Sequence, residues 1–157
     1  MNPLSFSVTG MHVLISGGCG GIGSAFAKAF LLNGAQVTVT DLKPPPDDLV
    51  MAGARYEQLD VTSDEAMENL AKAAIKEFGK LSIWINNAGG SPARLPMTDL
   101  KREDWDACIA LNLTAVWVGI RTAAKYMETG SIINISSGAG FGPVPGSAHY
   151  GAAKAAV

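Results

Sequence analysis

The chain has 157 residues, a length within reach of one domain, and its 48% hydrophobic content and mean hydropathy of +0.20 favour a packed core over disorder. Its formal net charge is -2, and the lysines and arginines are scattered among the acids. This pattern offers no basic surface for nucleic acid or anionic lipid, so we expect neither as a partner.

The N-terminal segment and the two cysteines give no sign of export, membrane anchoring or metal binding. No apolar run approaches the roughly 18 residues of a membrane-spanning helix. Residues 1–10 have neither a cationic start nor a long apolar segment. We therefore expect a cytoplasmic protein with no membrane partner. Cys19 and Cys108 lack CxxC or metal-ligand spacing, which predicts two free thiols and no metal site.

Short apolar runs rich in β-branched residues alternate with longer helical patterns along the chain. The prolines after the second run predict a loop at 44–48. Thr62 followed by Glu65 fits a capping box that opens a helix. The last helical pattern begins at Tyr150 and shows no C-terminal glycine stop. The expected strands are 12–16, 36–40, 55–59, 83–86 and 131–135, and the expected helices are 21–33, the segment from the capping box to 78, 101–127 and the segment from 150.

This alternation is typical of βαβ units, in which helices cover both faces of a parallel sheet. The runs at 13–15 and 132–133 are continuously apolar, as buried parallel strands are. We predict an α/β fold, a doubly wound parallel sheet of Rossmann type with about five strands. Residues 1–157 should form a single domain that is incomplete at its C-terminal side and cut within the helix that carries Tyr150 and Lys154.

A glycine-rich turn joins the first predicted strand to the first helix, with the sequence Ser16-Gly17-Gly18-Cys19-Gly20-Gly21-Ile22-Gly23. A dinucleotide pyrophosphate needs backbone N–H groups, a helix N-terminus and no side chains in the way. Gly17, Gly21 and Gly23 can supply that geometry, and their place between strand and helix favours a dinucleotide site over an ordinary flexible turn. We interpret Cys19 as a tolerated small residue; a redox switch is the alternative.

Asp41 lies at the end of the second strand, 18 positions beyond Gly23. A carboxylate there can accept hydrogen bonds from both adenine-ribose hydroxyls, and it repels a 2′-phosphate. No lysine or arginine occurs within 16–23 to hold such a phosphate, although Lys43 is close. The sequence therefore predicts NAD in preference to NADP. The alternative is that Asp41 only caps a turn.

Tyr150 and Lys154 stand four residues apart, on one face of the last predicted helix. Moving a hydride to or from a carbonyl needs a proton donor or a base at the oxygen. A free phenol titrates near 10 and needs a neighbouring cation to ionise near neutral pH, which Lys154 can provide. An ordinary surface pair is the alternative. Ser137, at the end of a strand, favours the acid/base interpretation because its hydroxyl could hold the substrate oxygen. His149 is expected to be an exposed loop residue.

With these residues in view, the chain closely resembles the short-chain dehydrogenase/reductase family. The resemblance covers essentially the whole chain in order and spacing, with one departure at Ser16, where the family usually has threonine. The motifs that carry it are Ser16-Gly17-x-x-x-Gly21-Ile22-Gly23, Asp60-Val61, Asn86-Asn87-Ala88-Gly89, Asn112, Ser137 and Tyr150-x-x-x-Lys154.

The resemblance implies how the cofactor would be held. Asp60 and Val61 would contact adenine. Asn87, Ala88 and Gly89 would border the cofactor and support the central sheet. Together with the glycine turn, including Ser16 and Ile22, and with Asp41, they form the expected NAD site of the domain.

The resemblance also implies catalytic roles. Asn112 would hold a water in a proton relay, and Ser137 would orient the substrate oxygen. Tyr150 would be the general acid/base. Lys154 would bind the nicotinamide ribose and stabilise the phenolate. The expected function is oxidoreduction of a small alcohol or ketone.

Members of the family run well beyond the length of this chain, and they commonly form homo-oligomers through the long helix and the tyrosine helix. The second of these helices is cut short here, which puts both oligomerisation and activity in doubt. A truncated or non-catalytic nucleotide-binding module is the rival function. A hydroxysteroid, a 3-oxoacyl thioester and a small sugar alcohol all stay open as substrates.

Overall fold

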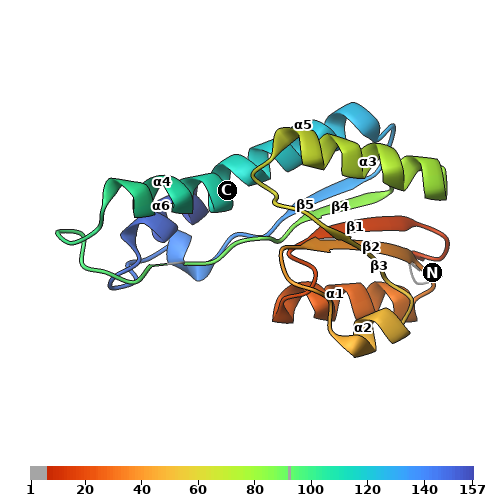
Figure 1. The fold of residues 1–157 in the computed structure, drawn as a ribbon, viewed down its shortest axis with the longest axis horizontal. Coiled ribbons are helices and arrows are strands. Elements are labelled where there is room, and N and C mark those ends of the chain that lie inside the picture. The colour runs from red at the N-terminus through yellow and green to blue at the C-terminus, as the bar shows by residue number, and fades with distance from the viewer. Residues whose placement is uncertain (1–6, 92) are drawn as a thin grey trace, which may run out of the picture.

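The computed structural model describes residues 7–91 and 93–157, and it contains a parallel sheet with helices on both faces (Figure 1). The strand order is β3-β2-β1-β4-β5, and each neighbouring pair is parallel. This confirms the predicted doubly wound α/β fold. The strands are β1 (His12–Ser16), β2 (Gln36–Asp41), β3 (Arg55–Gln58), β4 (Ile83–Asn86) and β5 (Ser131–Asn134). The helices are α1 (Gly21–Leu32), α2 (Asp47–Met51), α3 (Asp64–Phe78), α4 (Arg102–Ile109), the π-helix η1 (Ala110–Thr114), α5 (Ala115–Tyr126), the 3-10 helix η2 (Gly138–Gly140) and α6 (Ala148–Ala156).

The sheet separates two apolar cores, and β1 contributes to both. Val13 and Ile15 lie in the core that α1 and α2 cover, whereas Leu14 lies with Trp84 in the core under α3 and α5. All three β1 side chains are fully buried. Because successive side chains of a strand point to opposite faces, a strand covered on both sides must be apolar throughout. Each such side chain stabilises the fold by about 1.5–3 kcal/mol when fully buried.

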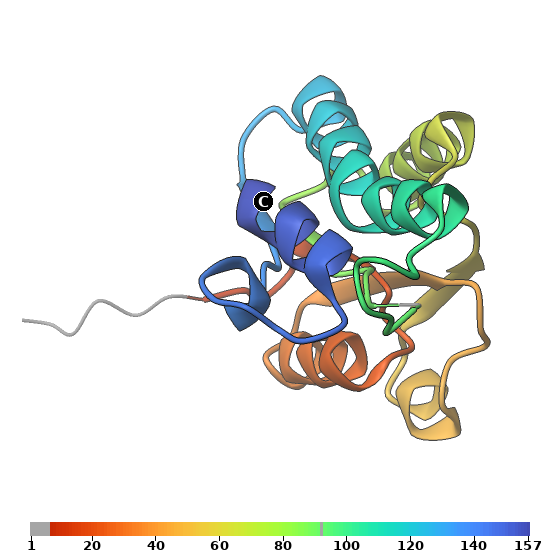
Figure 2. The same cartoon turned by 90° about the vertical axis from the view of Figure 1, so that its left-hand side faces the viewer.

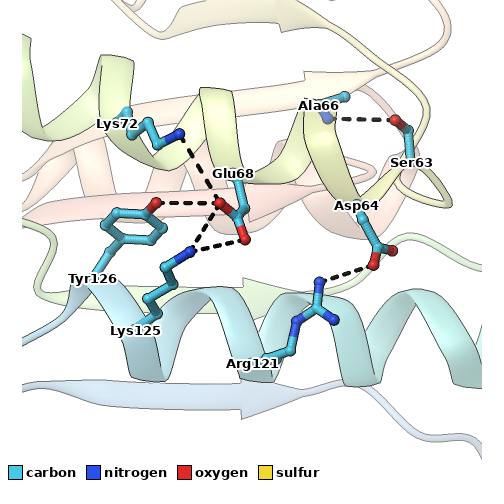
Figure 3. A network of polar contacts seen from close by, with 8 residues as sticks. All are labelled: Ser63, Asp64, Ala66, Glu68, Lys72, Arg121, Lys125 and Tyr126. Carbon is cyan, nitrogen blue, oxygen red and sulfur yellow. Dashed lines mark hydrogen bonds and ion pairs between the residues drawn. The ribbon is translucent and has the colours of Figure 1, made fainter.

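Ion pairs join α3 to α5 across the surface (Figure 3). Asp64 accepts from Arg121 at 2.8 Å, and Glu68 accepts from Lys125 at 3.0 Å. The Tyr126 hydroxyl also donates to Glu68. These side chains are at least partly exposed, so solvent screens each pair and each adds little to the stability of the fold. The network links the surfaces of α3 and α5 and contributes little to the free energy of folding.

One predicted loop and one predicted helix start are corrected. The loop predicted at 44–48 contains the first residues of α2, because proline is compatible with the residue before a first helical turn and Pro46 occupies that cap position. Leu49 of α2 is fully buried, which anchors this short helix. The capping box was placed one residue early. Ser63 caps α3 by accepting from the Ala66 N–H, while Thr62 donates to the Asp60 carboxylate.

The long helix predicted at 101–127 is present as Arg102–Tyr126, interrupted by the π-helix η1. It contains an 18-residue window with a mean hydropathy of 1.4, so among the described residues one helix is long and apolar enough to cross a membrane by length and composition. The evidence for a span is weak, because 44% of the window is buried inside the protein and its α5 part packs on α3 and β4. The helix is part of the core.

The last helix, α6, begins at Ala148, two residues before its predicted start. His149 therefore lies in a helix and is only 1% exposed, so its assignment to an exposed loop was wrong. Helix α6 packs against η2, α4 and η1. Both views show the two helices side by side, beyond the strands (Figures 1 and 2).

Strand β5 lies at one edge of the sheet. Its two isoleucines, Ile132 and Ile133, are 37% and 40% exposed, whereas the valine and the isoleucine of β1 are fully buried. The predicted continuous apolar run is therefore correct as a strand but is not covered on both faces among the described residues. An open edge with exposed apolar side chains is prone to pair with another chain.

Candidate cofactor cavity and acid/base centre

A cavity of about 370 Å³ opens at the carboxyl ends of β1, β2 and β4. The chain leaves β1 toward β2 on one side and later returns to β4 on the other, so the loops after β1 and β4 diverge at this point. Ligands of open parallel sheets bind in such a crevice. The cavity is lined by Gly17, Gly20, Gly21, Ile22, Gly23, Asp41, Leu42, Leu59, Asp60, Val61, Asn87, Ala88, Gly89 and Leu111.

The glycines of the turn differ in what they require. Gly17 has a φ of +63°, and a Cβ there would lie 2.7 Å from the Ala88 Cα. A Cβ on Gly23 would lie 2.2 Å from the Gly17 carbonyl oxygen. A Cβ on Gly21 would meet nothing within 4 Å. The fold therefore needs Gly17 and Gly23 for close packing of its own backbone, whereas Gly21 leaves open space in the cavity.

The N-terminus of α1 opens onto the same space. Its cap residue is Gly20, so no side chain at that position caps the first N–H groups, and the first turn carries no acidic residue. The first N–H groups of a helix lack partners within the helix and favour an anion. The turn can thus accept a phosphate.

Ser16 lies under the cavity and is 3% exposed. Its hydroxyl accepts from the backbone N–H groups of Asn87 and Ala88, each at 3.1 Å. The Asn87 side-chain amide donates to the carbonyl oxygens of Ser16 and Gly17, each at 3.0 Å. These bonds lock the loop after β1 to the loop after β4. Ser16 was predicted as a cofactor residue, and the structure places it behind the residues that line the cavity.

Asp41 ends β2 at the cavity wall. One carboxylate oxygen accepts from the Cys19 backbone N–H and the other from the Lys43 backbone N–H, both at 3.2 Å. Burial, and secondarily the Asp41 charge, raises the pKa of the Cys19 thiol to about 11. A protonated thiol is a poor nucleophile, which favours the interpretation of Cys19 as a tolerated small residue. Cys19 and Cys108 are both free, as predicted.

Four cavity residues were missed by the sequence analysis: Gly20, Leu42, Leu59 and Leu111. Leu42 and Leu59 directly follow the strands β2 and β3, so their place at the carboxyl edge was the available signal. Leu111 lies in η1 and gave no such signal, because a leucine in a helical pattern reads as core.

At the Gly89 end of the cavity lie two of the predicted catalytic residues. A Cβ on Gly89 would lie 2.7 Å from the Asn112 amide oxygen and 3.2 Å from the Lys154 ammonium nitrogen. Asn112 is fully buried; its amide oxygen accepts from the Gly90 N–H at 2.9 Å, and its amide nitrogen donates to the Gly90 and Cys108 carbonyl oxygens at 2.8 and 3.0 Å. Its side chain therefore braces the loop after β4.

Lys154 is 4% exposed, and burial lowers the pKa of its ammonium. Its Nζ donates to the Ile135 carbonyl oxygen at 2.8 Å and lies 5.9 Å from the centre of the Tyr150 ring. At that distance the cation can act on the phenol electrostatically. Tyr150 is half-buried on the same helix.

Ser137 lies on the segment that leads from β5 into η2. Its hydroxyl oxygen accepts from the Ala139 N–H at 3.2 Å, which starts η2. The helices η2 and α6 contact each other, so the serine segment and the tyrosine helix are neighbours. Among residues 7–91 and 93–157, no three metal-binding side chains gather into a cluster.

The comparisons with known proteins agree with this arrangement. The family model described as "short chain dehydrogenase" matches residues 11–157. The chain belongs to the short-chain dehydrogenase family. It is 37% identical to 2,5-dichloro-2,5-cyclohexadiene-1,4-diol dehydrogenase of Sphingobium indicum, over 96% of this chain and 64% of that protein.

Two further relatives differ in the substrates that their names give. A 3-oxoacyl-(acyl-carrier-protein) reductase of Synechocystis is 34% identical, over 96% of this chain and 65% of its own. The crystal structure of carveol dehydrogenase from Mycobacterium avium in complex with NAD is 26% identical with a TM-score of 0.87, covering 97% of this chain and 63% of that chain. The chain thus spans about two thirds of the length of its relatives, or slightly less.

Proposed function

We propose that this chain binds NAD and forms the cofactor-binding part of an oxidoreductase that transfers a hydride between NAD(H) and an alcohol or carbonyl group. The observation that carries the proposal is the cavity at the carboxyl edge of the sheet, whose Gly89 end lies beside the Lys154 ammonium. The residues fit a dinucleotide: the N-terminus of α1 suits a pyrophosphate, and Gly21 leaves the space open. Bound NAD would supply the hydride acceptor or donor.

We infer that the cavity prefers NAD to NADP. The Asp41 carboxylate lines the cavity, and its two oxygens accept only backbone N–H groups among the described residues. Each oxygen keeps a lone pair that a ribose hydroxyl could use. A 2′-phosphate would meet this negative charge. Asp60 and Val61, which follow β3, would border the adenine.

The residues around Lys154 would carry out the proton transfer to or from the substrate oxygen. Tyr150 would give a proton to a carbonyl oxygen or take one from an alcohol, and the nearby ammonium of Lys154 would stabilise the phenolate. Ser137 would orient the substrate oxygen. Asn112 would brace the Gly90 loop and take part in the proton relay.

The substrate is proposed only as a small alcohol or ketone, used in the cytoplasm. The relatives act, by name, on a cyclohexadiene diol, a 3-oxoacyl carrier protein and carveol, so similarity does not choose among substrate classes. The rival function is a nucleotide-binding module without catalysis. The open edge at β5 favours it, because the exposed Ile132 and Ile133 indicate that this chain alone leaves the side chains of β5 uncovered.

Replacing Tyr150 with phenylalanine tests the proposal. The change keeps the ring and removes the proton, so NAD-dependent turnover should fall about a hundredfold while NADH affinity changes little. Fluorescence titration gives the affinity, and absorbance of NADH follows turnover with a panel of secondary alcohols and ketones. NADH binding without any turnover by the unmutated chain would favour the non-catalytic module, and near-normal turnover by Tyr150→Phe would remove the acid/base assignment.

A further inference from the structure

The segment that follows β5 holds Lys154 at two points. The Nζ of Lys154 donates to the Ile135 carbonyl oxygen at 2.8 Å. The hydroxyl of the next residue, Ser136, donates to the main-chain carbonyl oxygen of Lys154 at 2.5 Å. Two consecutive residues therefore hold both the ammonium and the backbone of one residue of α6.

The backbones around these two bonds are in direct contact. A Cβ on Gly140 would lie 2.7 Å from the Lys154 carbonyl oxygen, and a Cβ on Gly151 would lie 3.0 Å from the Ala139 carbonyl oxygen. Glycine at both positions lets η2 and α6 approach without side chains between them. Such a contact brings the two backbones close together, but it does not by itself fix how far one is shifted along the other. A directed hydrogen bond can fix that shift.

This position matters because the Lys154 ammonium is confined. The residue is 4% exposed, and its Nζ would lie 3.2 Å from a Cβ on Gly89, at the end of the cavity. A shift of α6 along η2 would carry the ammonium away from that end. Ser136 is itself exposed and does not line the cavity, and its one side-chain hydrogen bond among the described residues goes to Lys154.

We propose that Ser136 is a positioning residue, whose hydroxyl holds the backbone of Lys154 where its ammonium reaches the Gly89 end of the cavity. The role rests on the proposed function, since that function gives Lys154 its task. The hydrogen bond itself can be tested without cofactor.

The test is the rate at which a deuterated acetylating reagent modifies each lysine of the 157-residue chain, followed by mass spectrometry. Because Lys154 is buried, the reagent reaches it when the local structure opens, so its rate reports the opening equilibrium. Loss of one net hydrogen bond should raise the Lys154 rate in Ser136→Ala about three- to tenfold. Exposed Lys43 and Lys101 should keep their rates and serve as internal references.

Two variants separate positioning from general destabilisation. Ser136→Thr keeps the hydroxyl and should restore the slow rate. Ser131→Ala removes an exposed serine from the other end of β5, one that makes no side-chain hydrogen bond within the described part of the chain, and should leave the rate unchanged. The pH dependence of acetylation gives the pKa of Lys154, which should rise toward its ordinary value in Ser136→Ala because the ammonium becomes better solvated.

Three results would overturn the role of Ser136: an unchanged Lys154 rate in Ser136→Ala, an equal increase at every lysine, or a Lys154 in the unmutated chain that reacts as fast as Lys43. A parallel titration of the unmutated chain with NADH separates the two proposals. Absent NADH binding, together with a Lys154 rate that depends on Ser136, would remove the cofactor function and leave the hydrogen bond established.

Discussion

Gly21→Ala should weaken cofactor binding without weakening the fold. Gly21 begins α1 and lines the cavity, and a Cβ there would meet no protein atom within 4 Å. Alanine at an unstrained helical position stabilises by about 0.4–1 kcal/mol, so the melting midpoint should stay or rise slightly. The added methyl would occupy the space where a pyrophosphate approaches the backbone. Loss of one charge-assisted hydrogen bond, at about 1.5–3 kcal/mol, lowers NADH affinity roughly ten- to a hundredfold.

Two other glycines provide matched controls. Gly23→Ala would place its Cβ 2.2 Å from the Gly17 carbonyl oxygen, and overpacking of this kind costs about 1–3 kcal/mol or more. Its melting midpoint should fall by about 2–4 °C for each kcal/mol. Gly142→Ala meets nothing within 4 Å and lies outside the cavity, so neither property should change.

The assay pairs a thermal melt with a fluorescence titration of NADH for each of the three variants. We expect NADH affinity and thermal stability to respond separately. Gly21→Ala should lose NADH affinity alone, and Gly23→Ala should lose stability. Unchanged NADH affinity in a folded Gly21→Ala protein would refute the placement of the pyrophosphate at this turn.

Three further predictions address other parts of the molecule. Gly89→Ala should lower the melting midpoint and NADH affinity, because its Cβ would lie 2.7 Å from the Asn112 amide oxygen; Gly90→Ala, with nothing within 4 Å, should change neither. Burial lowers the pKa of His12 from 6.5 to about 4 in the folded protein. On acidification the unfolded state therefore binds a proton first, and the free energy of unfolding should fall by up to about 3 kcal/mol from pH 6.5 to 4. A His12→Gln variant whose denaturation profile against pH equals that of the unmutated chain would contradict this. The open edge of β5 should make the 157-residue chain self-associate, and a strictly monomeric sedimentation profile at all concentrations would count against that.

The strands and most helices were predictable because their signals are local. Val13, Leu14 and Ile15 form a continuous apolar run, which a strand buried on both faces requires, and they are fully buried. Helix α2 was missed because prolines dominate its sequence signal, whereas the burial of Leu49 that anchors it depends on the distant α1 core. Likewise, His149 is buried in a helix that packs on α4 and η1, far away in the sequence.

The candidate site shows the same division. Gly17, Gly21, Gly23 and Asp41 could be chosen from chemistry and spacing, and they line one cavity. Asn112 could not, because a helical asparagine has no local mark of function and its hydrogen bonds to Gly90 arise only from the tertiary fold. Ser136 was missed for a similar reason, since its partner is a backbone carbonyl 18 residues further on.

The most direct measurement is a paired titration of the unmutated chain with NADH and NADPH. We expect saturable binding of NADH, with NADPH roughly ten- to a hundredfold weaker because its 2′-phosphate meets the Asp41 carboxylate. Asp41→Asn keeps an acceptor oxygen, removes the charge and should narrow that gap. Tighter binding of NADPH by the unmutated chain would contradict the assigned role of Asp41, and a folded chain that binds neither nucleotide would contradict the account as a whole.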